Sequence, residues 1–338
     1  MLSRQAIKFL EQNGIVGDYD LSPISGGANN RVYKISRSEE CEGLVLKCYY
    51  HTSEDKRDRF NSECSFYKWL WSQGIRRTPE PIAWCNEHRM ALFTYIRGEK
   101  ILPGEIETNQ ICESLDFIRD LNASRDLPEA QSVPLGSEAC FSLNEHLACV
   151  DRRIERLQKI DVNNSACKRA AKFIKKELTP AWWSIREKIR QSGSKTNLNF
   201  DTQLTHSDRC LSPSDFGFHN AIVAPDDSIY FFDFEYAGWD DPAKLMCDFF
   251  CQPEIPIGLT YWEEFLDHFA GIFNDEPLLT ERVQMLLPAY QIKWCCIMLN
   301  EFTPIGLARR KHASLGKIDH STKQLQKTLE YYNNLEKI

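Results

Sequence analysis

The spacing of apolar residues changes several times in the N-terminal part of the chain. The first segment is predicted to be a helix, because apolar residues recur at helical spacing at Leu2, Ala6, Phe9 and Leu10. Gly14 follows them and can end this helix. Short apolar runs between turn residues then predict strands over 21–25, 31–36, 43–50, 81–85 and 90–96. A charged segment with an apolar stripe predicts one long helix over 53–74. These elements indicate a small, mostly antiparallel lobe over residues 1–96.

The pattern beyond residue 97 is mostly helical. Apolar residues at helical spacing predict helices over 111–122, 143–160 and 166–191, and again from residue 261 onward. Residues 221–234 differ, because two apolar strands flank a Pro-Asp-Asp-Ser turn and predict a hairpin. The sequence contains no internal repeat. We therefore predict an α+β chain whose second lobe, over 97–338, is larger and mainly helical.

Composition places the chain among ordinary soluble globular proteins. Its 338 residues correspond to about two domains at roughly 150 residues each. Hydrophobic residues make up 42% and charged residues 26%, which excludes disordered and fibrous classes. A net charge of -7 supplies no overall basic field for nucleic acid. The basic stretches at 152–160 and 168–176 have helical spacing, and we interpret them as the solvent faces of two helices.

The same composition predicts a cytoplasmic protein without a membrane partner. No apolar stretch reaches the roughly 18 residues that span a bilayer, and the N-terminus lacks the apolar run of a signal peptide. The 13 cysteines are an odd number with no CxxC pair. This favours free thiols in a reducing compartment over a disulfide framework or a zinc site. The sequence predicts no particular oligomeric state.

A glycine-rich turn is the first candidate for binding chemistry. It is followed by a strand, whereas Walker and dinucleotide-binding motifs are followed by a helix. Its residues are Gly26, Gly27, Asn29 and Asn30. Such a hairpin can offer backbone N–H groups to a nucleotide, and a plain turn is the alternative.

A lysine inside an apolar strand is the second candidate. Lys47 lies in the run Leu-Val-Leu-Lys-Cys-Tyr-Tyr, where an unpaired ammonium group would be costly. The nearest acid on a helix that could pack behind this strand is Glu63. A lysine held by a helix glutamate can point at nucleotide phosphates, as in protein kinases. A solvated charge is the simpler explanation for either residue alone, but the order of turn, lysine and glutamate favours a nucleotide site.

The segment 214–242 holds the strongest candidates for catalysis. Asp215 and Asn220 lie five residues apart on a tight loop that contains Gly217, and Asp233 follows the next apolar strand. The three side chains can converge, with one carboxylate to accept a hydroxyl proton and an Asn and Asp pair to offer oxygen ligands to Mg²⁺. Acids that only stabilise turns are the alternative.

These features, in this order, resemble the aminoglycoside phosphotransferase and choline kinase superfamily, which shares the protein-kinase fold. The most specific match is Asp-Phe-Glu-Tyr-Ala-Gly-Trp-Asp-Asp-Pro at 233–242, within a resemblance over about residues 21–250. The resemblance implies a bilobal protein-kinase-like fold, ATP or GTP with Mg²⁺ as cofactors, and a small-molecule hydroxyl acceptor. The resemblance also implies roles for single residues. Asp215 would be the general base, and Asn220 and Asp233 the metal ligands. Lys47 and Glu63 would form the phosphate clamp, and Thr94, Tyr95 and Ile96 the hinge that binds adenine.

Two positions depart from the pattern of this family. Pro213 stands where the family has the histidine of its His-x-Asp, and Asp240 stands where glycine precedes Asp-Pro. In this fold that histidine mostly organises the loop, so its absence affects the expected loop geometry more than the identity of the proton acceptor. The alternative function is therefore a catalytically weak or inactive kinase-like protein that binds nucleotide. His206 and Asp208 form a second His-x-Asp, but a proline follows in the place of the metal-binding Asn. We interpret them as an adjoining element that contacts substrate.

The sequence thus predicts ATP- and Mg²⁺-dependent transfer of the γ-phosphoryl group to a hydroxyl of a sugar, an aminosugar or an amino alcohol. A protein kinase is the weaker alternative, because Asp-Phe-Glu leads directly into a Gly-Trp-Asp-Asp-Pro turn and no Ala-Pro-Glu follows. Acids and aromatic residues are expected to contact the acceptor, namely Asp215, Tyr236, Trp239, Asp240, Trp294 and Glu301. An anionic acceptor would instead suit Arg309, Arg310 and Lys311.

Overall fold

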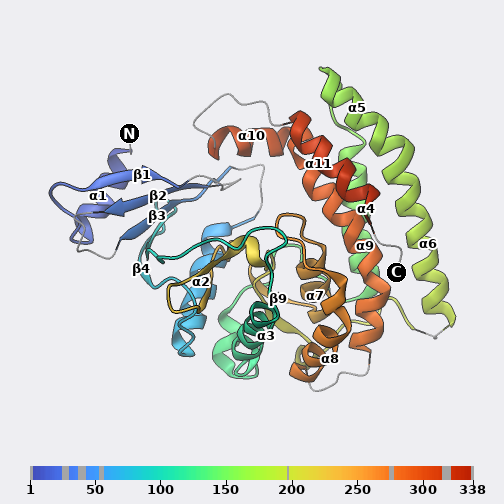
Figure 1. Ribbon diagram of the computed structural model, residues 1–338, viewed down its shortest axis with the longest axis horizontal. Coiled ribbons are helices and arrows are strands. Elements are labelled where there is room, and N and C mark those ends of the chain that lie inside the picture. Colours follow the sequence, from blue (N-terminus) through green and yellow to red (C-terminus); the bar gives the residue numbers. More distant parts are fainter. Residues whose placement is uncertain are drawn as a thin grey trace.

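The N-terminal part of the chain is built on one five-stranded antiparallel sheet (Figure 1). The computed structural model describes residues 3–24, 30–36, 43–52, 57–195, 198–273, 278–313 and 321–335. The strand order is β1-β2-β3-β5-β4. The strands are β1 (Asp20–Pro23), β2 (Arg31–Ser36), β3 (Leu44–Cys48), β4 (Pro81–Cys85) and β5 (Met90–Thr94).

Different helices cover the two faces of this sheet. Successive side chains of a strand point to opposite faces, so Leu46 and Lys47 of β3 are separated. Leu46 packs in a buried cluster with α1 (Arg4–Gln12). The opposite face packs on α2 (Arg59–Ser72), which begins after Asp58, whose side chain accepts the Asn61 N–H at 3.1 Å. The helix predicted over 53–74 thus begins at residue 59, and residues 53–56 lie outside the described ranges.

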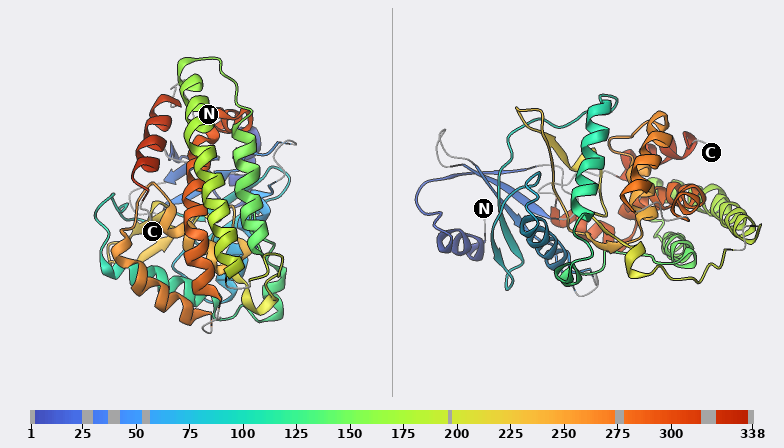
Figure 2. Two further views of the ribbon diagram at one scale, coloured as in Figure 1. Left: turned by 90° about the vertical axis from the view of Figure 1, so that its right-hand side faces the viewer. Right: turned by 90° about the horizontal axis from the view of Figure 1, so that it is seen from below.

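Helices make up most of the rest of the chain. The central helix of this part, α9 (Leu279–Met298), packs against α4, α6, α7 and α11. Figure 2 shows α4, α6 and α9 running alongside one another. The predicted helix over 166–191 is α5 and α6 joined by a π-helical turn, Ile174–Leu178. The remaining helices are α3 (Thr108–Asn122), α4 (Leu143–Leu157), α5 (Ser165–Phe173), α6 (Thr179–Lys195), α7 (Pro242–Cys251), α8 (Trp262–Ile272), α10 (Pro304–Ala313) and α11 (Ser321–Asn333).

Two pairs of short antiparallel strands carry the segment with the candidate catalytic residues. One pair is β6 (Cys210–Ser212) with β9 (Gly238–Asp240), and the other is the predicted hairpin, β7 (Ala221–Val223) with β8 (Ile229–Phe231). Short 3₁₀ turns lie in the connections of this part of the chain, at Pro128–Ser132, His206–Asp208, Phe218–Asn220, Leu259–Tyr261 and Leu299–Phe302. The β6 and β9 pair was not predicted, because three-residue strands carry too few positions to show alternation.

The connection after β5 is tied to the β7–β8 hairpin. Glu99 and Val223 exchange two backbone hydrogen bonds, each 2.9 Å long. Gly98 has a φ of 152°, and a Cβ atom there would lie 2.1 Å from the carbonyl oxygen of Val223. Only glycine therefore allows this close approach of two backbones.

An aromatic cluster joins the sheet-bearing part to the helical part. The ring of Phe234, which follows the hairpin, lies 5.1 Å from those of Phe66 and Tyr67 in α2 and 6.2 Å from that of Phe117 in α3. Ring pairs at these distances contribute packing beyond simple burial. The predicted α+β class with an antiparallel sheet and a mainly helical remainder is confirmed, and the boundary at residue 96 stays a prediction.

Two further expectations concern the chain as a whole. Every cysteine that the structure describes is a free thiol, and Cys41 lies outside those residues. Among the described helices, none combines the length and the apolar character needed to cross a bilayer.

Candidate active site

Lys47 contacts two carboxylates where the sheet meets the helical part. Its Nζ lies 2.6 Å from Oε2 of Glu63 in α2 and 2.5 Å from Oδ1 of Asp233 after β8. Burial alone would lower the pKa of Lys47, but the carboxylates of Asp233 and Glu63 raise it well above its ordinary value. Lys47 therefore remains a cation in a buried position, and three residues nominated from the sequence lie in direct contact.

Glu63 is held by three donors. Besides Lys47, the hydroxyl of Tyr49 donates to its Oε2 at 2.6 Å, and the backbone N–H of Phe234 donates to its Oε1 at 3.1 Å. Burial raises the pKa of Glu63 to about 7, against the opposing effect of Lys47. The backbone bond to Phe234 means that Glu63 positions the Asp233 segment as well as the lysine.

The loop 213–220 presents Asp215 at the end of β6. The Asp215 N–H donates to the Pro213 carbonyl at 2.9 Å, and the Asn220 side-chain amide donates to the Asp215 carbonyl at 2.9 Å. Ser214 between them has a φ of 65°. These bonds close the loop without the histidine that the family has in the place of Pro213.

A histidine from the same loop contacts the Asp215 carboxylate. His219 Nε2 lies 3.2 Å from Asp215 Oδ1. Burial alone would raise the pKa of Asp215, but His219 lowers it on balance, with smaller contributions from Lys293 and Lys244. Asp215 is therefore ionised near neutral pH and able to accept a proton. The sequence reasoning named Asp215 but not His219. The position of His219 only four residues after Asp215 was the signal that could have indicated this contact.

The β7–β8 hairpin places Asn220 next to the residue before Asp233. Ala221 pairs with Phe231, and one position further the N–H of Phe232 donates to the Asn220 carbonyl at 3.1 Å. Asp233 has a φ of 68°, which changes the chain direction after β8. Amide and carboxylate oxygens are the donors that Mg²⁺ prefers, so the chemistry of this pair fits the ion. Within the described ranges, no group of three or more His, Cys, Asp or Glu suits a metal, so phosphate oxygens and water would have to complete its shell.

The predicted glycine-rich turn is described only at its last residue. Gly26, Gly27 and Asn29 lie outside the described residues. Asn30 is 6% exposed, bonds to Glu235 through its amide nitrogen, and accepts the Tyr50 N–H at 3.0 Å. Its side chain thus connects the sheet to the Asp-Phe-Glu segment.

Of the three hinge residues, Thr94 is the last residue of β5, and Tyr95 and Ile96 follow it. The N–H of Thr94 donates to the Glu80 carbonyl at 3.0 Å, and that of Tyr95 donates to the Gly43 carbonyl at 2.8 Å. Neither amide is therefore available to a nucleotide base in this arrangement. Ile96 is half-buried and comes next in the connection.

A pocket of about 280 Å³ opens beside Asp215. Four of the six expected acceptor contacts line it, namely Asp215, Tyr236, Trp294 and Glu301. The expectation was wrong for Trp239 and Asp240. Both are buried, because the Trp239 indole donates to the Ala130 carbonyl at 3.0 Å and Asp240 pairs with Lys244. The side chains of Arg309, Arg310 and Lys311 lie outside the described part of the structure.

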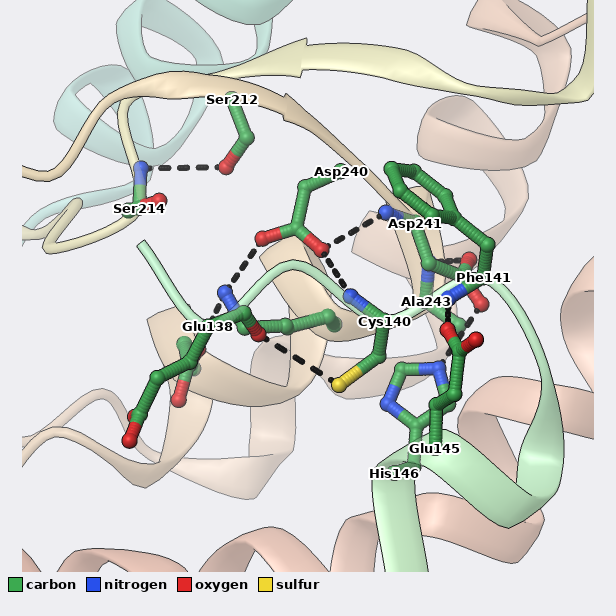
Figure 3. A network of polar contacts seen from close by, with 12 residues as sticks. Glu138, Cys140, Phe141, Glu145, His146, Ser212, Ser214, Asp240, Asp241 and Ala243 are labelled. Carbon is green, nitrogen blue, oxygen red and sulfur yellow. Dashed lines mark hydrogen bonds and ion pairs between the residues drawn. The ribbon is translucent and has the colours of Figure 1, made fainter. Parts of the chain in front are cut away.

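Charged residues that the sequence reasoning missed line the inner part of this pocket. They are Glu138, Arg153, Lys244, Asp248 and Lys293. They come from α4, α7, α9 and the loop before α4, and Figure 3 shows that loop crossing next to Asp240. For Lys244 and Asp248 alone, the sequence offers a clue to a position near the site, because both closely follow the Asp-Asp-Pro turn at 240–242.

The second His-x-Asp is an exposed turn that does not line the pocket. Asp208 accepts the N–H of Thr205 at 3.2 Å, and the His206 ring lies 4.4 Å from that of Trp239. These contacts account for both residues as structural, so the expected substrate contact receives no support here.

Comparisons with known proteins bear on the family and the fold. A family model described as a phosphotransferase enzyme family matches residues 20–270. The sequence matches none of the curated proteins. Among solved structures, the chain is similar to spectinomycin phosphotransferase in complex with ADP and spectinomycin, with a TM-score of 0.62, 14% identity, and coverage of 100% of this chain and 95% of that chain.

Two similar structures come from eukaryotic parasites. Choline kinase from Cryptosporidium parvum has a TM-score of 0.56 and 14% identity, covering 97% of this chain and 95% of that chain. Ethanolamine kinase from Plasmodium vivax has a TM-score of 0.57 and 15% identity, covering 96% and 87%. At such identities the likeness establishes the fold.

Proposed function

Because this chain belongs to the phosphotransferase enzyme family, we propose that it transfers the γ-phosphoryl group of ATP, with Mg²⁺, to a hydroxyl group of a small molecule. The observation that carries the proposal is the contact of Lys47 with both Glu63 and Asp233. The β7–β8 hairpin connects Asp233 to Asn220, whose side chain bonds to the Asp215 backbone. The similar structures include one solved with ADP, and their acceptors are spectinomycin, choline and ethanolamine by name. We propose a sugar, an aminosugar or an amino alcohol as the broad acceptor class.

Lys47 is the proposed partner of the nucleotide phosphates. Its ammonium is buried and held in place by Glu63, which fixes the position of the charge before a nucleotide arrives. Phosphoryl transfer depends on positioning and on neutralising spread negative charge, so a fixed cation is the contribution required. Asp233, which contacts the lysine through Oδ1, would share that cation with the phosphates.

Asn220 and Asp233 are the proposed holders of Mg²⁺. When bound there, the ion would neutralise charge on the phosphate oxygens. The amide nitrogen of Asn220 is used within the loop, so its side-chain oxygen is the atom that would face the ion. Glu63 supports this site through its bond to the Phe234 N–H.

Asp215 is the proposed general base. The acceptor oxygen forms its bond to the γ-phosphorus as the bond between that phosphorus and the ADP oxygen breaks, and the hydroxyl proton moves to the Asp215 carboxylate. His219 lowers the pKa of Asp215 and holds one of its oxygens, which supports an ionised, oriented base. The adenine is proposed to lie at the hinge near Ile96, because the amides of Thr94 and Tyr95 are engaged, and GTP remains an alternative donor.

One experiment tests the proposal. ADP release by the full chain is measured with Mg·ATP and each member of a panel of sugars, aminosugars, amino alcohols and amino acids, and again with EDTA. We expect acceptor-dependent release that EDTA abolishes. Asp215→Asn should lower turnover by roughly 10²–10⁴-fold, while Asp208→Asn, the matched control on the other His-x-Asp, should retain it.

Parent-like turnover of Asp215→Asn would show that the base is wrongly assigned. Binding of Mg·ATP without acceptor-dependent release across the panel would favour the alternative, an inactive nucleotide-binding protein. Labelling of protein substrates by ATP would instead favour a protein kinase.

A further inference from the structure

Three cations form the inner wall of the pocket beside Asp215. Lys244 of α7, Lys293 of α9 and Arg153 of α4 all line it and are 2%, 4% and 8% exposed. Buried charges are costly unless carboxylates or ligands compensate them. The partners of these three residues therefore decide which charge the pocket presents.

Fewer carboxylates than cations line this wall of the pocket. Lys293 Nζ lies 2.8 and 2.9 Å from the two oxygens of Asp248, and Lys244 Nζ lies 3.6 Å from the same carboxylate. The Trp294 indole N–H also donates to Asp248, at 2.9 Å. One carboxylate thus serves two ammonium groups and an indole.

The second partner of Lys244 lies behind the wall. Asp240 pairs with Lys244 and accepts the N–H groups of Cys140 and Asp241 at 3.1 and 2.9 Å (Figure 3). It is fully buried and does not line the pocket. Glu138, the partner of Arg153, does line it. The wall therefore shows three cations and two carboxylates, Glu138 and Asp248, to a ligand.

Three pocket-lining residues have a buried polar atom without a described partner. Arg153 Nε, the hydroxyl of Ser214 and His219 Nδ1 make no hydrogen bond to any residue that the structure describes. Buried polar atoms are normally satisfied, so these residues have hydrogen-bonding capacity that the described chain leaves unused.

The acids at the outer part of the pocket are less buried. The Glu254 carboxylate is largely exposed and pairs with Lys327 at 2.8 Å, and Glu301 is half-buried. The most buried charges of the lining are thus the three cations and the Asp248 carboxylate, whereas Glu254 and Glu301 are more exposed. An ammonium group placed at depth would face the three cations in a site where their charges are weakly screened.

We propose that the acceptor carries a carboxylate, bound by the wall of Lys244, Lys293 and Arg153, on the same small molecule as its reacting hydroxyl. The inference rests on the proposed function. A volume of about 280 Å³ lies just below the roughly 300–1,000 Å³ of pockets for drug-sized ligands, which fits a molecule as small as a hydroxy acid or a hydroxylated amino acid. An amino group on such a molecule is accommodated at the acidic rim.

Matched pairs of probes that differ in the carboxylate test this. Binding of L-serine and ethanolamine, and of glycerate and ethylene glycol, is measured calorimetrically on the full chain with Mg²⁺ and a non-hydrolysable ATP analogue. We expect the carboxylate member of each pair to bind at least roughly tenfold more tightly. Equal or tighter binding of ethanolamine or ethylene glycol, or no binding of either carboxylate, overturns the inference.

Variants locate the preference on the wall. Lys293→Met should reduce the serine to ethanolamine affinity ratio, whereas Lys327→Met, which removes a cation at the rim, should leave the ratio unchanged. An unchanged ratio in folded Lys293→Met contradicts the inference. If that variant fails to fold because Asp248 is left unpaired, the matched pairs on the parent protein still decide.

The inference and the proposed function can fail separately. Phosphorylation of ethanolamine or choline with no binding of carboxylates would leave the phosphotransferase and overturn the carboxylate site. Binding of serine or glycerate without ADP release from any acceptor would keep the carboxylate site and count against the activity.

Discussion

Lys47 Nζ lies 2.5 Å from Asp233 Oδ1, so a strand of the N-terminal sheet and the segment after the β7–β8 hairpin meet in a direct ion pair. The carboxylate of Glu63 contacts the same ammonium from the other side. A nucleotide phosphate that approaches Lys47 must therefore share it with Asp233, which makes the lysine a sensitive position for both binding and turnover.

Lys47→Met should reduce turnover by roughly 10²–10³-fold, because the fixed cation facing the transferred charge is lost. Nucleotide affinity should fall as well. Steady-state ADP release and titration with a fluorescent ATP analogue measure the two effects. Lys68→Met on the exposed side of α2 removes the same charge and should behave as the parent. Unchanged turnover of Lys47→Met would remove the lysine from the mechanism.

His219 is predicted to be a positioning residue for Asp215. The 3.2 Å contact to Oδ1 restrains the carboxylate, and a misplacement of a reacting group by about 1 Å can cost roughly 10²-fold in rate. His219→Ala should lower kcat with little effect on the KM for ATP, and His219→Gln, which retains a donor, should recover part of the loss. A rise in the KM for ATP with constant kcat would instead indicate a binding role.

The local part of the site could be predicted from sequence. Asn220 and Asp233 lie at the two ends of the β7–β8 hairpin and Asp215 lies on the loop before it, so short loops and strand pairing alone bring these positions into one segment. Lys47 and Glu63 were accessible because a charge inside an apolar strand demands a partner. The strands of the sheet and most helices could also be predicted, because the periodicity that indicates each of them lies within one short stretch of sequence.

The wall of the pocket could not be predicted in this way. Arg153, Lys244 and Lys293 come from three helices that only packing brings together. The interpretation of 152–160 as a solvent face was wrong for Arg153, which is buried. Trp239 and Asp240 failed in the opposite sense. Their motif suggested ligand contact, but the pairing of β9 with β6 turns them into the core.

Gly98→Ala tests the tie between the interlobe connection and the hairpin. A Cβ atom at this position would lie 2.1 Å from the Val223 carbonyl oxygen, so the two backbones would have to separate. We expect a loss of roughly 2 kcal/mol or more in the free energy of unfolding, from strain and from overpacking. Chemical denaturation measures it.

Gly104→Ala is the matched control for that prediction. Gly104 also has a positive φ, 87°, but a Cβ atom there meets nothing within 4 Å. Its cost should be limited to the backbone conformation, about 1 kcal/mol. Equal destabilisation of the two variants would show that the close approach to Val223 has no energetic weight.

Asp241 gives a prediction for stability as a function of pH. Its carboxylate caps α7 by accepting the Ala243 N–H at 2.7 Å, and it lies 3.0 Å from Arg282 Nη2 and 3.1 Å from His146 Nε2. Burial alone would raise the pKa of Asp241, but the bond from His146 and the charge of Arg282 lower it to about 2. A carboxyl group whose pKa is lower in the folded than in the unfolded state stabilises the fold above the unfolded value, 3.8, and loses that effect as pH falls toward about 2.

Asp241→Asn should therefore reduce the free energy of unfolding by about 3–5 kcal/mol near neutral pH, because the buried contacts of Arg282 and His146 with this carboxylate lose its charge. The difference from the parent should shrink as pH falls from about 4 to 2, where the parent carboxylate itself takes up a proton. Urea unfolding at a series of pH values measures both curves. Asp267→Asn, on the exposed side of α8, should follow the parent at every pH. A constant gap between the Asp241→Asn and parent curves down to pH about 2 would mean that hydrogen bonding to the amide, and not the carboxylate charge, stabilises this helix end.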